Sequence, residues 1–194
     1  DVTNGILRGT EYIFNKENLD FINEIVDKTE SALLEALSNL SSASAKYSFN
    51  ELNGVGSNRN DENLAGDNSF LTIYLENEYK RTIIYSYACH PTILKPDNLE
   101  VSSDFVGVVN SYFKDRSYDF VMFLNGSAGD ISTRFNKIGE GFSEVERFGN
   151  LIISHIEKSL DNLMDFRLEV THKHDYLKLN TKKPDSVDFA KAKY

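Results

Sequence analysis

The chain has 194 residues, of which 40% are hydrophobic, with 13 Phe and 10 Tyr. This composition is typical of a chain that folds around a substantial core and argues against disorder. The formal net charge of -9 argues against a nucleic-acid partner, because phosphate binding depends on Lys and Arg, which the acids outnumber here.

The sequence contains one cysteine, Cys89, so no internal disulfide is expected. No apolar run is long enough to cross a bilayer, so we expect no transmembrane segment. The chain starts at Asp1 without an initiator Met or a charged-then-apolar leader, and we expect an N-terminal piece to be missing. Localisation therefore stays open between secreted and cytoplasmic.

The first half of the chain predicts one helix followed by strands. Apolar residues recur at helical spacing over residues 18–40 and predict an amphipathic helix. Alternating aromatic and polar residues predict a short strand over 46–50, and the Gly- and Asn-rich stretch 53–69 predicts a loop. Residues 70–75 and 82–88 are rich in β-branched and aromatic residues and predict a β-hairpin.

The second half predicts two helices and further strands. Ser102 or Ser103 is a suitable N-cap for a helix over 104–114, and 119–124 predicts a buried strand. A long helix is predicted over 143–163. A strand follows over 166–171 and continues over 176–179.

Strands interleaved with helices define the fold class as α/β, a mixed β-sheet layered with α-helices in a single domain. Residues 1–180 are assigned to this domain, and the polar, Lys-rich residues 181–194 to a linker or a truncated end.

His90 is the first candidate site residue. It follows a predicted buried strand, and the next residue, Pro91, restricts the backbone beyond it. Functional side chains often occupy such strand ends, although a histidine in a turn with a satisfied hydrogen bond fits the same pattern. One histidine alone does not make a zinc site, because catalytic zinc usually has three protein ligands.

Ser132 is the second candidate. It lies in a stretch of small residues, 125–134, whose backbone can turn tightly and approach a ligand. A serine hydroxyl beside backbone amides and a metal or base suits acyl transfer. A serine that merely caps the next element is the alternative, because Gly, Asp and Ser are common in turns.

Three short blocks follow one another along the chain: Asn58-Arg59 in a Gly-rich loop, Cys89-His90-Pro91-Thr92 followed by Ser102-Ser103-Asp104-Phe105-Val106-Gly107, and Asn125 to Ser132 ending in Gly-Asp-Ile-Ser. In this order and spacing the blocks together resemble the neutral ceramidase family, over residues 49–134 and less clearly to 179.

This resemblance implies a zinc-dependent amide hydrolase that cleaves an N-acyl amine such as ceramide. It implies that His90 is a zinc ligand and that Ser132 is the nucleophile, attacking a carbonyl polarised by Zn²⁺ to give an acyl-enzyme that water resolves. Asp130 is assigned to the catalytic turn, which it would orient by accepting backbone amides. Arg59, Asn125 and Gly129 are expected to contact the substrate.

The chain departs from the family pattern in two ways. The family's remaining zinc ligands are an upstream His from a His-X-His motif and a downstream Glu and Tyr, and they have no counterparts here. We therefore interpret the chain as an internal fragment of a catalytic domain. We expect this fragment to be inactive without the remainder of that domain. Thr133-Arg134 replaces the usual Pro-Asn and adds a cation, so a hydrolase of another, acidic N-acyl compound is an alternative. A non-catalytic member that binds a ligand or partner through the same loops is a further alternative.

Other polar residues receive structural interpretations. His172 and His174 lie two apart, as metal ligands on one strand can, but they follow the serine block and are interpreted as polar residues at a strand end. His155 is expected on a helix surface, and the acids around 61–62 and 144–146 on solvated faces. Asp104 is assigned to the start of its helix.

Overall fold

The computed structural model describes residues 16–165 and 171–178. Its regular elements are α3 (Lys16–Ser38), β1 (Ser44–Glu51), β2 (Ser57–Asn58), β3 (Ser69–Glu76), β4 (Arg81–Tyr87), α4 (Asp104–Lys114), β5 (Phe120–Asn125), β6 (Ile131–Ser132), α5 (Gly141–Leu160) and β7 (Met164–Asp165). Each helix and each long strand matches a predicted element within a few residues at its ends.

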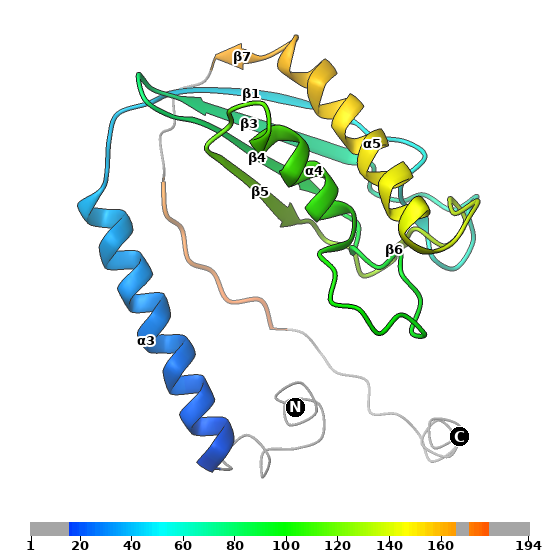
Figure 1. Cartoon of the computed structure of the whole chain (residues 1–194), viewed down its shortest axis with the longest axis horizontal. Coiled ribbons are helices and arrows are strands. Elements are labelled where there is room, and N and C mark those ends of the chain that lie inside the picture. Colours follow the sequence, from blue (N-terminus) through cyan, green and yellow to red (C-terminus); the bar gives the residue numbers. More distant parts are fainter. Residues whose placement is uncertain (1–15, 166–170, 179–194) are drawn as a thin grey trace.

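Five strands form one mixed sheet in the order β5-β4-β3-β1-β7 (Figure 1). The pairs β1–β7, β1–β3 and β3–β4 are antiparallel, and β4 and β5 are parallel because α4 connects them. The predicted hairpin and the predicted α/β class are both confirmed. A separate antiparallel pair, β2 with β6, joins the two loops that carry the serine and Arg59.

Helices α4 and α5 lie side by side on one face of the sheet and close the core (Figure 1). Alternate strand residues point into this core, among them Phe70, Ile83 and Tyr85, each fully buried. The two helices approach closely at Gly149, where an added Cβ would lie 2.5 Å from the Cγ1 atom of Val108.

The opposite face of the sheet is apolar and carries no helix or strand of the described part of the chain. Its cross-strand rows follow from the register: Tyr47, Ile73, Ile84 and Met122 form one, and Phe49, Leu71, Ser86 and Leu124 form the next. Phe49 keeps 61% of its surface exposed. An apolar face of this extent is ordinarily covered by another layer in a soluble domain.

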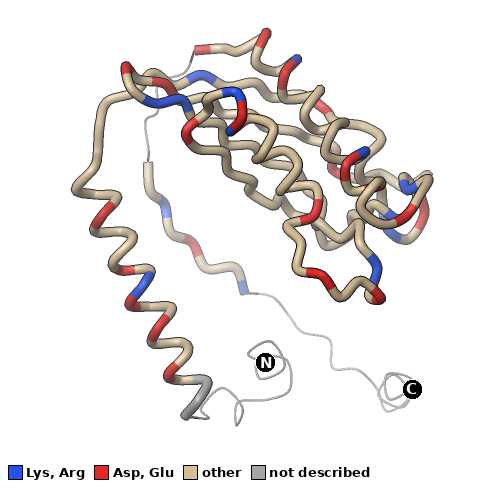
Figure 2. Tube along the Cα trace, in the orientation of Figure 1, with Lys and Arg blue, Asp and Glu red and all other residues tan. Residues whose placement is uncertain are grey.

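Helix α3 forms as predicted but extends away from the sheet (Figure 1). The described apolar side chains of its stripe, such as Val26, Leu33 and Leu37, are exposed. Acidic residues are distributed along the helix, including Asp20, Glu24 and Asp27 (Figure 2). No helix in the described residues is long and apolar enough to span a membrane.

Several predictions about burial and strands were wrong. Strand β5 is an edge strand of the described sheet, and Phe120, Met122 and Leu124 on its open face are exposed, so the segment is not a fully buried strand. Residues 176–178 have no regular structure, so the predicted continuation of a strand is absent there. The predicted strand over 166–171 and the polar tail lie mostly or wholly outside the described residues.

Candidate active site

His90 lies just beyond β4, at the edge where β4 and β5 both end. The parallel register pairs Tyr87 with Asn125, the last residue of β5. The amide nitrogen Nδ2 of Asn125 lies 2.9 Å from Nδ1 of His90 and donates a hydrogen bond to it. Both side chains are exposed, and the second ring nitrogen of His90, Nε2, makes no hydrogen bond within the described part of the chain.

The turn after His90 is anchored by two side chains from other elements. The Asp104 carboxylate, only 6% exposed, accepts hydrogen bonds from the amides of Ile93 and Leu94 at 2.9 and 3.2 Å. The Lys137 ammonium donates to the carbonyls of Thr92 and Ile93 at 3.0 and 2.8 Å. The histidine therefore starts a loop that is fixed on both sides.

Asp104 does more than begin its helix. Its φ of +53° is a left-handed conformation that a non-Gly residue rarely adopts, and its other carboxylate oxygen accepts the amide of Phe105 at 2.8 Å. The Ser102 hydroxyl accepts the Asp104 amide at 3.0 Å, whereas the Ser103 side chain makes no cap. Asp104 thus links the first turn of α4 to the histidine loop.

Ser132 lies in β6, and the β2–β6 pair brings four of the predicted site residues together. Ser132 pairs with Ser57 in this ladder. The Arg59 amide donates to the Asp130 carbonyl at 2.7 Å, and the Arg59 guanidinium donates to the Gly129 carbonyl at 3.3 Å. The Ser132 hydroxyl is half-buried and accepts the Arg134 amide at 3.1 Å, which leaves its own proton available for transfer.

The role expected for Asp130 in organising the turn is not seen. Its carbonyl takes part in the contact with Arg59, and its exposed carboxylate accepts no hydrogen bond from the described part of the chain. The turn is held instead by the ladder and by the amide of Ile131, which donates to the Ala128 carbonyl at 3.3 Å.

The histidine loop and the serine loop meet around Gly56. A Cβ added at Gly56 would lie 2.7 Å from Cγ2 of Ile131 and 3.6 Å from Sγ of Cys89. Because His90 follows Cys89 and Ser132 follows Ile131, both candidates belong to one end of the molecule. The Cys89 thiol itself is buried, and this burial raises its pKa to about 12, so it is a poor nucleophile.

The surroundings of Ser132 carry two unpaired cations. Arg59 and Arg134 are exposed, and within residues 16–165 and 171–178 neither forms an ion pair with a carboxylate. The Arg134 guanidinium lies 5.3 Å from the centre of the Phe135 ring. This part of the surface is suited to an anionic group even though the whole chain is acidic.

The described residues do not complete a metal site. They contain no group of three or more His, Cys, Asp or Glu side chains placed to hold a metal ion. His90 fits the part of a single ligand through Nε2. The rings of His172 and His174 are 6.3 Å apart in an exposed segment without regular structure, away from any strand.

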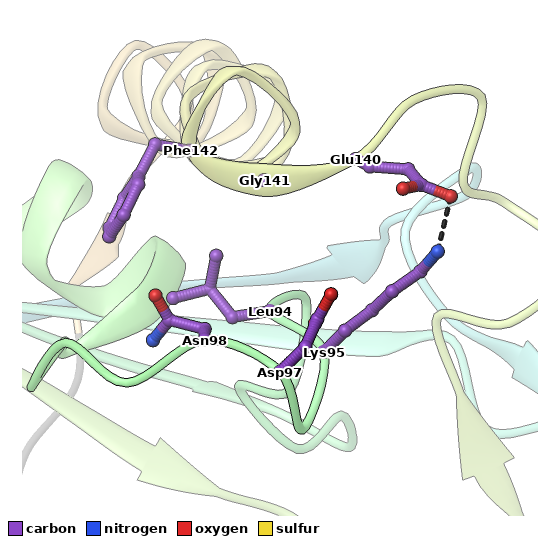
Figure 3. Close-up of a pocket in the computed structure, with 7 residues that line it drawn as sticks. All are labelled: Leu94, Lys95, Asp97, Asn98, Glu140, Gly141 and Phe142. Carbon is purple, nitrogen blue, oxygen red and sulfur yellow. Dashed lines mark hydrogen bonds and ion pairs between the residues drawn. The ribbon is translucent and has the colours of Figure 1, made fainter.

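A cavity of about 320 Å³ lies elsewhere, between the 94–98 loop and the start of α5 (Figure 3). It is lined by Leu94, Lys95, Asp97, Asn98, Glu140, Gly141 and Phe142, and the Lys95–Glu140 ion pair crosses one side of it. None of the candidate site residues lines this cavity.

Two residues that were assigned to the surface are part of the packed structure. Glu144 is 3% exposed and pairs with Arg147, so the predicted solvated face at 144–146 is wrong there. His155 is half-buried, donates a 2.6 Å hydrogen bond from Nε2 to Oδ1 of Asn50 and packs edge-on against Phe70. Lys137 was not identified from the sequence, because a lone lysine in a polar loop carries no pattern.

The solved structures similar to this chain include two ceramidases. One, described as a ceramidase complexed with C2, has a TM-score of 0.56 and 17% identity over 65% of this chain and 23% of that chain. The other is a neutral ceramidase from Pseudomonas aeruginosa, with a TM-score of 0.58 and 20% identity over 72% of this chain and 26% of that chain. No family model matches the sequence, and no curated protein matches it.

The resemblance to neutral ceramidases is thus confirmed at the level of the fold. The chain has the fold of part of these ceramidases and spans about a quarter of their length.

Proposed function

We propose that this chain is the nucleophile-bearing part of an amide hydrolase that cleaves an N-acyl amine of the ceramide type. The observation that carries the proposal is the meeting of the His90 and Ser132 loops around Gly56. The ceramidase-like fold supports the choice of an amide as the bond that is cleaved.

In this proposal the Ser132 hydroxyl attacks the amide carbonyl. An ester bond forms between Oγ and the acyl carbon, the C–N bond breaks, and the amine leaves carrying the proton that the serine gives up. Water then hydrolyses the ester, releasing the fatty acid and restoring the hydroxyl. The backbone around Gly129 is open, since an added Cβ there would meet nothing within 4 Å, and this leaves room for an acyl group.

We assign His90 as one ligand of a zinc ion whose other ligands lie outside the described residues. Bound zinc would supply Lewis-acid polarisation of the carbonyl. The anchored turn after His90 supports this role, because Asp104 and Lys137 fix the loop that begins at the histidine and so limit its freedom before a metal binds.

The test is hydrolysis of a ceramide by the full-length protein and its Ser132→Ala variant. We expect the variant to lose turnover by about a thousandfold or more while its thermal unfolding is unchanged. Ser127→Ala is the matched control, because Ser127 is an exposed serine of the same loop, and it should retain activity. Retained turnover in Ser132→Ala would remove Ser132 from the mechanism.

A second candidate substrate is an N-acyl compound that carries an acid. The unpaired guanidinium groups of Arg59 and Arg134 favour it, because either could pair with a carboxylate. Parallel assays of neutral ceramide and of an N-acyl amino acid separate the two. If the acidic substrate is preferred, Arg134→Gln should reduce kcat/KM for it and leave the rate with ceramide unchanged.

A further inference from the structure

We propose that Asn125 is a positioning residue that holds Nδ1 of His90 and so leaves Nε2 as the nitrogen available to a metal. The inference deepens the proposed function and rests on it for the role of His90. Its geometric basis is the 2.9 Å contact between Asn125 Nδ2 and His90 Nδ1.

Asn125 cannot easily move away from the histidine. It ends β5 in register with Tyr87, and the next amide, that of Gly126, donates to the Tyr87 carbonyl at 3.0 Å. An added Cβ on Gly126 would lie 3.1 Å from the backbone of Ala88, so the two strand ends are in close contact. The backbone that carries the carboxamide is therefore fixed beside the start of the histidine loop by contacts that do not involve either side chain.

The hydrogen bond has a direct chemical consequence. A neutral imidazole carries one N–H donor and one acceptor nitrogen, and the NH₂ group of Asn125 can only donate. In this orientation of the amide, Nδ1 is the acceptor and the proton is on Nε2. In this form the Nε2 atom of His90 carries an N–H group and has no lone pair for a metal.

Metal binding through Nε2 requires the other tautomer, because the metal takes the lone pair of that nitrogen. Nδ1 then carries the proton, and the carboxamide must turn so that its oxygen accepts it. Asparagine can serve both forms with one rotation of the amide. It can therefore hold the same ring orientation before and after a metal binds.

This role differs from the substrate contact expected for Asn125. A residue that only touches substrate would not change the histidine tautomer when it is replaced. Asn125→Asp offers an acceptor alone at the same place, and so it should stabilise the form with the proton on Nδ1. Asn125→Leu keeps a similar shape and removes the hydrogen bond.

The first experiment measures the His90 tautomer in the metal-free full-length protein by long-range ¹H–¹⁵N correlation spectroscopy at about pH 9, where imidazoles are neutral. We expect the Nε2–H form in the unchanged chain and a shift to the Nδ1–H form in Asn125→Asp. Asn150→Asp adds the same charge on an exposed site of α5 and should cause no shift. A dominant Nε2–H form in Asn125→Asp would overturn the inference.

The second experiment measures zinc affinity in the full-length protein by competition with a chelator. Asn125→Leu should weaken zinc binding by about 10- to 100-fold, and Asn125→Asp should restore it. Equal affinity in all three proteins would count against a positioning role. If the unchanged protein holds no zinc, the metal assignment of His90 fails, and the tautomer measurement still decides the role of Asn125.

Discussion

At the scale of single residues, Glu144 is buried, although the run of acids at 144–146 predicted a solvated face. Its carboxylate accepts hydrogen bonds from Arg147 and from the Ile138 amide, and these partners lower its pKa to about 2. Arg147 in turn donates to the Asn136 carbonyl at 2.7 Å. The pair therefore fixes the segment between β6 and α5, although its three-residue spacing is also common on exposed helix surfaces.

Replacing Glu144 should make the fold less stable and change its response to acid. We expect Glu144→Gln to lower the free energy of unfolding at pH 7 by about 2 kcal/mol, because charge-assisted hydrogen bonds are lost. Since the folded pKa is depressed, the stabilisation is complete above the ordinary value of 4.5 and is lost as the pH falls toward about 2.

Urea unfolding between pH 7 and pH 2.5 measures both effects. Glu146→Gln is the matched control, because Glu146 is exposed on the same helical turn, and it should cost less than about 0.5 kcal/mol. A variant of Glu144 that is as stable as this control would contradict the assignment.

His155 was assigned to a helix surface and is instead half-buried, again because of contacts that the sequence pattern does not show. Its neighbours in sequence suggest the polar side of a helix, but in the fold it contacts Asn50 on β1 and the ring of Phe70. Burial lowers its pKa. Only the packing of α5 against the sheet reveals this, and helical periodicity does not specify which strand a helix will cover.

At the scale of elements, the long elements were predictable and the short ladder was not. Helices α4 and α5 and strands β1, β3 and β4 follow from residue patterns that extend over seven or more residues. Strands β2 and β6 have two residues each, too few to show alternation. Their pairing nevertheless places Ser132 opposite Ser57 and brings Arg59 to the turn before Ser132, so this part of the candidate site could not be derived from pattern alone.

The contact between α4 and α5 gives a prediction at this scale. In Gly149→Ala the new methyl group would overlap Val108, whose Cγ1 and Cβ atoms lie 2.5 and 2.6 Å from its position. We expect destabilisation of about 1–3 kcal/mol, which exceeds the gain of about 1 kcal/mol in helix propensity. Thermal unfolding measures this loss of stability. Asn150→Ala, at an exposed neighbouring position, is the control and should be neutral or slightly stabilising. Equal melting temperatures for Gly149→Ala and the unchanged protein would contradict a close contact between the two helices.

At the scale of the whole molecule, the open apolar face of the sheet explains why β5 was predicted as buried. Phe120, Met122 and Leu124 have the composition of core residues, and they lie exposed on a face without a covering element in the described part of the chain. The convergence of the two site loops was partly predictable, because parallel strands bring their carboxyl ends to one edge. The contact at Gly56 depends on the loop between β1 and β3, whose path has no sequence signature.

The central claim is that Ser132 forms the covalent bond to the acyl group. The most direct test is rapid acid quench of the full-length protein during ceramide turnover, followed by tryptic digestion and mass spectrometry of residues 117–134, which contain Ser117, Ser127 and Ser132. We predict a fatty-acyl ester on Ser132 in this peptide and none on the other two serines. Turnover with an acyl group trapped on a different residue of the protein would contradict the account.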